Sequence, residues 1–136
     1  LNLKGPFRLS ALAGERMVTA GGGVIINVST NGSLRPHPAY LPYAAAKAGL
    51  NALTEGLAKA YGPTVRVNTL MPGPFLTDIS RAWRLEEGRA DSNPFAGYAL
   101  QRAGDPAEIV GAAVFLMSDA SSFTTGSIVH ADGGFP

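Results

Sequence analysis

A chain of 136 residues is long enough to form one domain with its own hydrophobic core. Apolar residues make up 46% of the chain and charged residues 15%, a balance that argues against intrinsic disorder. The formal net charge is +1 and no run of Lys or Arg could neutralise a phosphate backbone, so we expect no nucleic-acid partner.

The residue types present also exclude several kinds of site. The absence of cysteine excludes disulfides and thiolate nucleophiles and fits a reducing compartment. His37 and His130 lie far apart without ligand spacing, so we expect no metal site. No apolar stretch reaches the roughly 20 residues of a membrane span and no signal-peptide pattern is present. We therefore expect a cytoplasmic protein with no membrane partner.

The first half of the chain predicts a helix, a strand and a second helix. Helical spacing of apolar residues predicts a helix over residues 1–20, which Gly5-Pro6 should kink or restart because proline lacks an N–H. The β-branched run over residues 24–28 is typical of a parallel strand that is buried on both faces. The strongest helical pattern covers residues 42–61, with Pro42 in its first turn and Gly62-Pro63 after it.

The second half repeats this alternation. Residues 65–71 and 127–131 are expected to be strands, and residues 77–89, with Ile79 and Trp83, a short amphipathic helix. A capping sequence, Asp105-Pro106-Ala107-Glu108, precedes an apolar helix predicted over residues 109–117.

Strands that alternate with helices predict an α/β fold with about three parallel strands and flanking helices. The strand over residues 24–28 has the composition of an interior strand and should have a neighbour on each side. We therefore expect residues 1–136 to be a single partial domain, the second half of a doubly wound parallel sheet whose N-terminal half is missing.

Tyr43 and Lys47 are four residues apart near the start of the strongest helix, so both side chains should project from one face. A phenol ordinarily has a pKa near 10, and a cation within a few ångströms favours its ionised form, which suits it to acid–base catalysis. The spacing alone is short enough to occur by chance.

Three hydroxyl residues, Ser29, Thr30 and Ser33, follow the first predicted strand. They should lie at the carboxyl edge of the sheet, where open α/β sheets bind ligands. Their hydroxyls could contact a substrate or could bond only to the local backbone.

Five segments in order resemble the short-chain dehydrogenase/reductase family. They are Asn2-Leu3-Lys4-Gly5, Asn27-Val28-Ser29-Thr30, Tyr43-Ala44-Ala45-Ala46-Lys47, Val65-Arg66-Val67-Asn68 with Pro72-Gly73, and Asp132-Gly133-Gly134. The resemblance covers essentially the whole chain. It implies a Rossmann-type fold and an oxidoreductase that transfers a hydride between NAD or NADP and a small-molecule alcohol or carbonyl substrate.

The resemblance also implies roles for single residues. Tyr43 would donate or accept the proton, Lys47 would favour its ionised form and bond the nicotinamide ribose, and Asn2 would anchor a relay water. The position of the catalytic hydroxyl, thirteen residues before the tyrosine, falls on Thr30, with Ser29 as the alternative. The cofactor-binding residues would be Tyr43 and Lys47 together with Pro72, Gly73, Phe75 and Thr77.

Residues 75–95, including Leu76 and Trp83, resemble the family's mobile substrate lid, although any amphipathic surface helix would show the same pattern. Pro72 and Gly73 could equally form a plain turn, and Thr77 a helix cap.

The family's glycine-rich phosphate turn and its cofactor-selecting residue have no counterpart in the sequence. Gly21-Gly22-Gly23 precedes a strand, whereas a phosphate turn follows a strand and opens a helix. The choice between NAD and NADP therefore stays open.

Two functions follow as expectations. In the first, the parent protein is a dehydrogenase or reductase that forms homo-oligomers. In the second, the chain is an inactive fragment that at most binds another protein through the helix over residues 42–61.

Overall fold

The computed structural model describes residues 1–78, 80 and 93–135. Its helices and strands are, in chain order, α1 (Lys4–Thr19), β1 (Gly23–Val28), α2 (Leu41–Tyr61), β2 (Val65–Pro72), α3 (Val110–Met117) and β3 (Ile128–Ala131). Short 3-10 turns connect several of them. The helix predicted over residues 77–89, with Ile79 and Trp83, lies largely outside the described residues.

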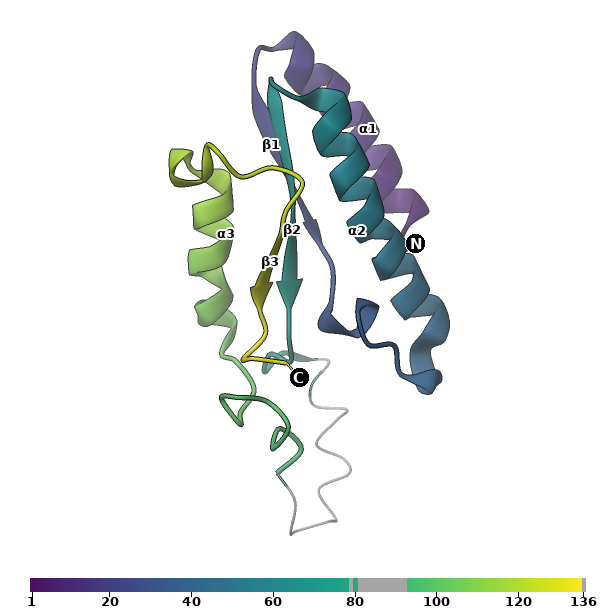
Figure 1. The fold of residues 1–136 in the computed structure, drawn as a ribbon, viewed down its shortest axis with the longest axis vertical. Helices are drawn as coiled ribbons and strands as arrows, with labels where there is room; N and C mark the ends of the chain where they lie inside the picture. Colours follow the sequence, from purple (N-terminus) through teal and green to yellow (C-terminus); the bar gives the residue numbers. More distant parts are fainter. Residues whose placement is uncertain (79, 81–92, 136) are drawn as a thin grey trace.

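The three strands form one parallel sheet in the order β1-β2-β3. Ile25 pairs with Val67 across the first ladder, and Thr69 pairs with Ile128 across the second. Figure 1 shows α1 and α2 together on one side of the strands and α3 on the other. The predicted α/β fold with about three parallel strands and flanking helices is thereby confirmed.

The core forms around the central strand, because β2 is the one strand of the described sheet with a neighbour on each side. Val65 and Val67 are almost completely buried, and they pack against Leu57 and Ala58 of α2. On α3, Leu116 is also fully buried. The packing of α2 against β2 fixes the helix that carries Tyr43 and Lys47.

Two predicted features of the first elements differ in the structure. Pro6 does not interrupt the helix, because α1 begins at Lys4 and the N–H groups of a first helical turn have no acceptor within the helix. The strand predicted to be buried is only partly so, with residues 24–26 half-buried and Val28 exposed, because β1 lies at the edge of the described sheet. An apolar groove of about 460 Å³ runs between α1 and β1, with Leu9 and Ile26 in its lining.

The capping sequence before α3 forms as predicted. The Asp105 carboxylate accepts the Ala107 N–H at 2.8 Å, and the Glu108 carboxylate accepts the Asp105 N–H at 2.7 Å. A 3-10 turn over Pro106–Ile109 takes up the first predicted turn, so α3 itself begins at Val110.

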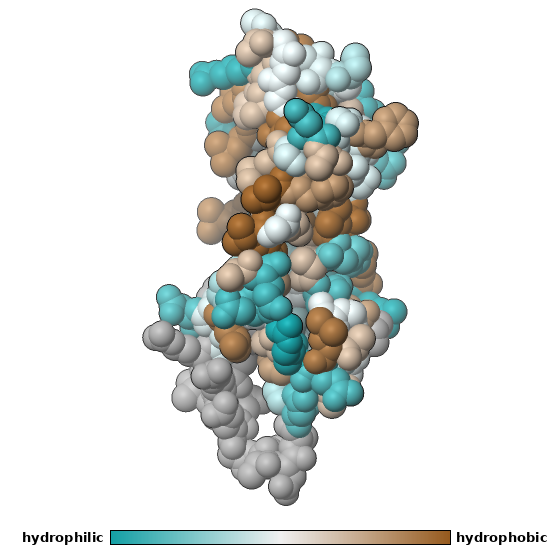
Figure 2. Space-filling model, turned by 90° about the vertical axis from the view of Figure 1, so that its left-hand side faces the viewer, coloured by the Kyte–Doolittle hydropathy of each residue, from teal (hydrophilic) through white to brown (hydrophobic). Residues whose placement is uncertain are grey.

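The outer side of α3 is apolar. Figure 2 shows apolar side chains gathered on the face of the molecule that carries this helix. The exposed ones are Val110, Val114, Phe115 and Met117.

Candidate active site

The candidate site lies at the carboxyl edge of the sheet, where the chain leaves the strands. Ser29 and Thr30 follow β1, Gly73 follows β2, and Asp132 follows β3. The start of α2 lies beside the same edge, since the 3-10 turn of residues 31–33 that follows β1 packs against it. Parallel strands bring these exits together, so groups far apart in sequence meet here.

The N-terminal turns of α2 present Tyr43 and Lys47 on one face. Pro42 occupies the first turn, as its fixed φ angle favours. Tyr43 is 39% exposed. The Lys47 ammonium lies 5.9 Å from the centre of the Tyr43 ring, within reach of a cation–π contact. The predicted pairing of these two side chains is present in the structure.

Lys47 also binds the end of β1. Its Nζ atom donates a hydrogen bond to the Val28 carbonyl oxygen at 2.7 Å. Partial burial lowers the pKa of Lys47 below its ordinary value of 10.5, because desolvation disfavours the charged form. The ammonium is thus held between the helix and the edge of the sheet.

Ser29 and Thr30 lie in different environments although they are adjacent. The Ser29 side chain is buried, and its hydroxyl lies 3.4 Å from both the Ser33 hydroxyl and the Lys47 carbonyl oxygen. Thr30 is half-buried, and its Oγ1 accepts the Gly32 N–H at 3.4 Å. The Thr30 hydroxyl is therefore the more accessible of the two.

Aromatic side chains from distant segments gather near Thr30. The Tyr40 ring stacks on His37 at 5.4 Å and meets Tyr43 edge to face at 6.4 Å. Tyr98 lies 5.4 Å from the ring of Phe135. These contacts form two aromatic groups, one around Tyr40 and one around Tyr98.

Sequence reasoning missed a contact between Asn31 and Tyr98. The Asn31 amide lies 3.5 Å from the Tyr98 hydroxyl, and burial raises the pKa of that phenol. The two residues are 67 positions apart, so no local pattern links them. Asn31 follows Thr30 directly, which brings Tyr98 close to the candidate catalytic hydroxyl.

The predicted turn after β2 is closely packed against the end of β3. The Gly73 N–H donates to the Ala131 carbonyl oxygen at 3.0 Å. A Cβ atom at position 73 would lie 2.6 Å from the Asp132 Cα, so only glycine fits this approach. Pro72 ends β2 within this turn.

The segment after this turn is held by backbone bonds. The Phe75 strand bridge to Gly104 joins it to the loop before α3. The Thr77 N–H donates to the Phe75 carbonyl oxygen at 2.9 Å and lies 3.0 Å from the Ser80 hydroxyl oxygen. Thr77 is exposed.

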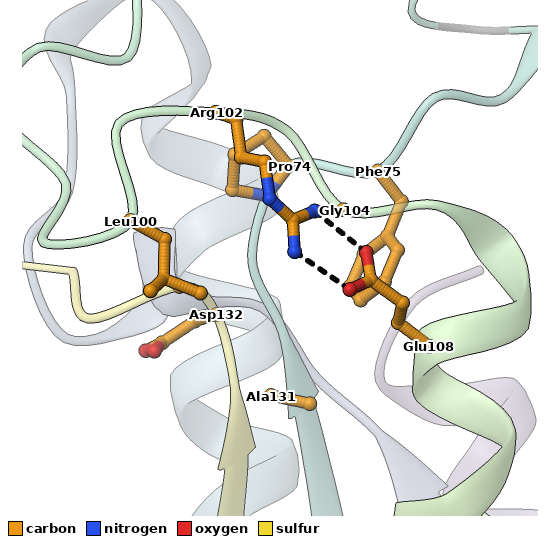
Figure 3. Close-up of a pocket in the computed structure, with 9 residues that line it drawn as sticks. Pro74, Phe75, Leu100, Arg102, Gly104, Glu108, Ala131 and Asp132 are labelled. Carbon is orange, nitrogen blue, oxygen red and sulfur yellow. Dashed lines mark hydrogen bonds and ion pairs between the residues drawn. The ribbon is translucent and has the colours of Figure 1, made fainter.

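A small pocket of about 100 Å³ opens between this segment and the end of β3. Figure 3 shows the Arg102 guanidinium and the Glu108 carboxylate joined by two hydrogen bonds, each of 2.7 Å, with Asp132 on the other side of the pocket. The bond from Arg102, with the Asp105 N–H, lowers the pKa of Glu108 to about 2. This ion pair ties the loop of residues 100–105 to the 3-10 turn that precedes α3.

Asn2 lies apart from the pair on α2. It is exposed just before α1 and lines an apolar hollow together with Ala46 and Leu53 of α2. Among the described residues it makes no hydrogen bond to Lys47 or Tyr43. Its role as the anchor of a water stays a prediction.

Two classes of feature are missing from the described part of the chain. Within residues 1–78, 80 and 93–135 no cluster of three or more His, Asp or Glu side chains could hold a metal ion. Over the same residues no helix is both long and apolar enough to cross a membrane.

Comparison with known proteins gives relatives along the whole chain. A family model described as enoyl-(acyl carrier protein) reductase matches residues 1–136. The NAD-dependent glycerol dehydrogenase of Listeria innocua is 34% identical over 137 residues, which cover 99% of this chain and 53% of the relative. The galactitol 2-dehydrogenase of Cereibacter sphaeroides is 37% identical over 142 residues, which cover 99% of this chain and 54% of the relative.

Solved structures show the same likeness. A gluconate 5-dehydrogenase from Burkholderia cenocepacia, in complex with NADP and tartrate, matches with a TM-score of 0.89 and 33% identity over 98% of this chain and 52% of its own. A 3-oxoacyl-(acyl-carrier-protein) reductase from Agrobacterium tumefaciens with NADP bound matches with a TM-score of 0.91 and 34% identity, over 99% and 53%. The chain spans about half the length of the relatives it matches. It belongs to the short-chain dehydrogenase/reductase family.

Proposed function

We propose that the complete protein, meaning the product of the whole reading frame that encodes this chain, transfers a hydride between NAD(H) or NADP(H) and an alcohol/carbonyl pair. This chain would supply the catalytic side chains. The observation that carries the proposal is the position of Lys47 at the carboxyl edge of the sheet, beside the Tyr43 ring and bonded to Val28, two residues before Thr30. A phenol, a cation and a hydroxyl in one place suit proton transfer to a carbonyl oxygen.

The residues at this edge fit the nicotinamide half of the cofactor. The Lys47 ammonium and the Tyr43 hydroxyl offer donors for the ribose hydroxyls, and Pro72, Gly73, Phe75 and Thr77 border the same edge. When bound, the cofactor supplies the hydride. The sequence contains no glycine-rich turn that would hold the adenine half. We therefore assign only half of a cofactor site to this chain.

The protein's own groups divide the remaining work. Thr30 would donate a hydrogen bond to the substrate oxygen, because its hydroxyl is accessible whereas that of Ser29 is buried. Tyr43 would give its proton to the oxygen during reduction and take it back during oxidation. Lys47 would stabilise the ionised phenol through its charge. Asn2 would anchor a water that resupplies the proton.

The names of the relatives support an alcohol or carbonyl compound as the substrate class without singling out one substrate. They include dehydrogenases of glycerol, galactitol and gluconate as well as a 3-oxoacyl reductase. We propose an alcohol or carbonyl compound as the substrate class for the complete protein, with NAD or NADP as its cofactor. The protein would act as a soluble cytoplasmic homo-oligomer, and the exposed apolar side of α3 (Figure 2) is a surface that self-association could cover.

The direct test is an assay of the complete protein with NADH and with NADPH against a panel of ketones, keto sugars, keto sugar acids and 3-oxoacyl thioesters. Reduced cofactor carrying deuterium at the transferable position should pass the label to the new C–H bond of the product. Cofactor binding without label transfer to any panel member would contradict the proposal.

The alternative, an inactive fragment, is favoured by one observation. The outer edge of β1 and the groove between α1 and β1 have no covering element among residues 1–78, 80 and 93–135. If the chain is present in cells without further sequence, this surface would bind another polypeptide and the chain would not reduce carbonyl compounds. Mass measurement of the cellular protein separates the two cases.

A further inference from the structure

A third polar residue on α2 contacts the loop that carries Thr30. Asn51 follows Lys47 by four residues and Tyr43 by eight, so the three side chains lie along one side of the helix. The Asn51 amide reaches Ser33, three residues after Thr30, with its Nδ2 atom 2.9 Å from the Ser33 hydroxyl oxygen. We infer that Asn51 and Ser33 are positioning residues that hold Thr30 in place, an inference that rests on the proposed function.

The direction of each hydrogen bond follows from the number of protons available. The Ser33 hydroxyl has one proton and donates it to the Thr30 carbonyl oxygen at 2.7 Å. The Ser33 oxygen can then only accept, so the group of Asn51 that faces it must be the amide nitrogen. A chain of bonds runs from Asn51 through Ser33 to the backbone of Thr30.

With its nitrogen bonded to Ser33, the Asn51 amide places its oxygen on the opposite side. Its Oδ1 atom is buried and has no hydrogen-bond partner among the described residues. Two other asparagines behave differently, since Asn27 and Asn68 use both their oxygen and their nitrogen atoms in hydrogen bonds. Asn51 thus directs its nitrogen to Ser33, and its own acceptor has no partner among the described residues.

The bonds also explain the shape of the loop. Thr30 is extended, and residues 31–33 form a 3-10 turn in which the Ser33 N–H donates to the Thr30 carbonyl oxygen at 3.0 Å. That oxygen therefore receives both the N–H and the hydroxyl of Ser33. Because Asn51 belongs to the helix of Tyr43 and Lys47, the contact sets the distance between the Thr30 hydroxyl and the Tyr43 hydroxyl.

Two substitutions separate positioning from folding. Asn51→Asp keeps the size of the side chain but replaces the amide nitrogen by a second oxygen. This carboxylate oxygen faces the Ser33 hydroxyl oxygen, so the Ser33 hydroxyl must turn its proton from the Thr30 carbonyl oxygen to the carboxylate. Asn51→Leu removes the unpaired buried acceptor as well as the bond. In the complete protein we expect both to lower kcat by about tenfold to a hundredfold, since small misplacements of reacting groups have effects of this size.

The same variants give a readout that does not depend on activity. Amide hydrogen exchange at residues 31–34 should become faster in both, while the thermal unfolding midpoint of Asn51→Leu should not fall. The KM for the cofactor should change little, because Asn51 lies eight residues beyond Tyr43 and its amide bonds to Ser33. Glu55→Gln, one turn further along α2, changes an exposed side chain that pairs with Lys59; it is the matched control and should alter neither kcat nor exchange.

Ser33→Ala completes a double-mutant cycle. If Asn51 acts through Ser33, the two effects should not add. The kcat of the double variant Ser33→Ala/Asn51→Asp should then lie within twofold of the kcat of Ser33→Ala. Normal kcat and normal exchange in Asn51→Asp would overturn the inference while leaving the proposed function intact. Loss of kcat in Tyr43→Phe alone would then show that the function holds and the positioning role does not.

Discussion

The Lys47 ammonium donates a hydrogen bond to the Val28 carbonyl oxygen at 2.7 Å and lies 5.9 Å from the centre of the Tyr43 ring. One cation thus links the end of β1 to the phenol on α2. Its partial burial lowers its pKa, so a proton is lost from it more readily than from a free lysine.

This burial predicts an alkaline limit to activity. As pH rises through the pKa of Lys47, which lies below 10.5, the cation that supports the ionised phenol disappears and kcat/KM should fall. In Lys47→Arg the cation persists, so this limb should move to higher pH even though overall activity drops, because arginine has a different shape. The measurement is a pH profile of kcat/KM for the complete protein. Lys59→Arg, on the exposed side of α2, is the control, and an unmoved limb in Lys47→Arg would refute the assignment.

The two adjacent hydroxyls should respond differently to substitution. Thr30→Ser keeps a donor and should retain activity, whereas Thr30→Val keeps only the shape and should lose about a hundredfold or more in kcat/KM. Ser29→Ala removes a buried hydroxyl and should lower the free energy of unfolding by about 1 kcal/mol with little change in kcat. Steady-state kinetics and denaturant unfolding measure both effects. A large loss of kcat in Ser29→Ala together with a small loss in Thr30→Val would show that Ser29, and not Thr30, carries the catalytic hydroxyl.

The Arg102–Glu108 pair should make the stability of the fold depend on pH in the acid range. The pKa of Glu108 is about 2 in the folded chain, below the ordinary value of 4.5, because of the bond from Arg102 and then the Asp105 N–H. The ionised Glu108 carboxylate therefore stabilises the folded state above about pH 4.5. This contribution to the free energy of unfolding is lost as the pH falls toward 2 and the carboxylate takes up a proton. The unfolding midpoint of Glu108→Gln should therefore lie below that of the wild type at pH 6 and approach it as the pH falls below 4. A constant difference between them down to pH 3 would contradict this.

The isolated chain of 136 residues should bind NADH or NADPH only weakly. Half of the cofactor contacts have no counterpart in its sequence, so we expect a dissociation constant above about 1 mM, or less than about 4 kcal/mol of binding free energy. The unpaired edge of β1 and the exposed apolar groove beside it should cause self-association. Fluorescence titration and size-exclusion chromatography measure the two effects. A monodisperse monomer with micromolar affinity would refute both expectations.

Local sequence patterns predicted the parts of the fold that depend on neighbours in the chain. The four-residue spacing of Tyr43 and Lys47 predicted that both lie on one face of α2. Asp105 and Glu108 predicted the cap before α3. Both features depend on residues only three or four positions apart. The parallel order of three strands followed from their alternation with helices.

Contacts between distant segments could not be predicted in this way. The approach of Tyr98 to Asn31 depends on the path of the chain after β2, which no short pattern describes. The half-buried state of β1 depends on which strands flank it, and the composition of β1 alone indicated a strand with two neighbours. The bond from Asn51 to Ser33 also needed the packing of the loop onto α2.

Substitution of Tyr43 by Phe in the complete protein tests the central claim most directly. The change removes only the hydroxyl that would carry the proton, and Tyr40→Phe, three residues earlier, is the matched control. Hydride transfer in a single turnover should fall about a thousandfold in Tyr43→Phe, with circular dichroism and the unfolding midpoint unchanged, and Tyr40→Phe should stay within about threefold of the wild type. Near-normal hydride transfer in Tyr43→Phe would show that Tyr43 is not the proton donor.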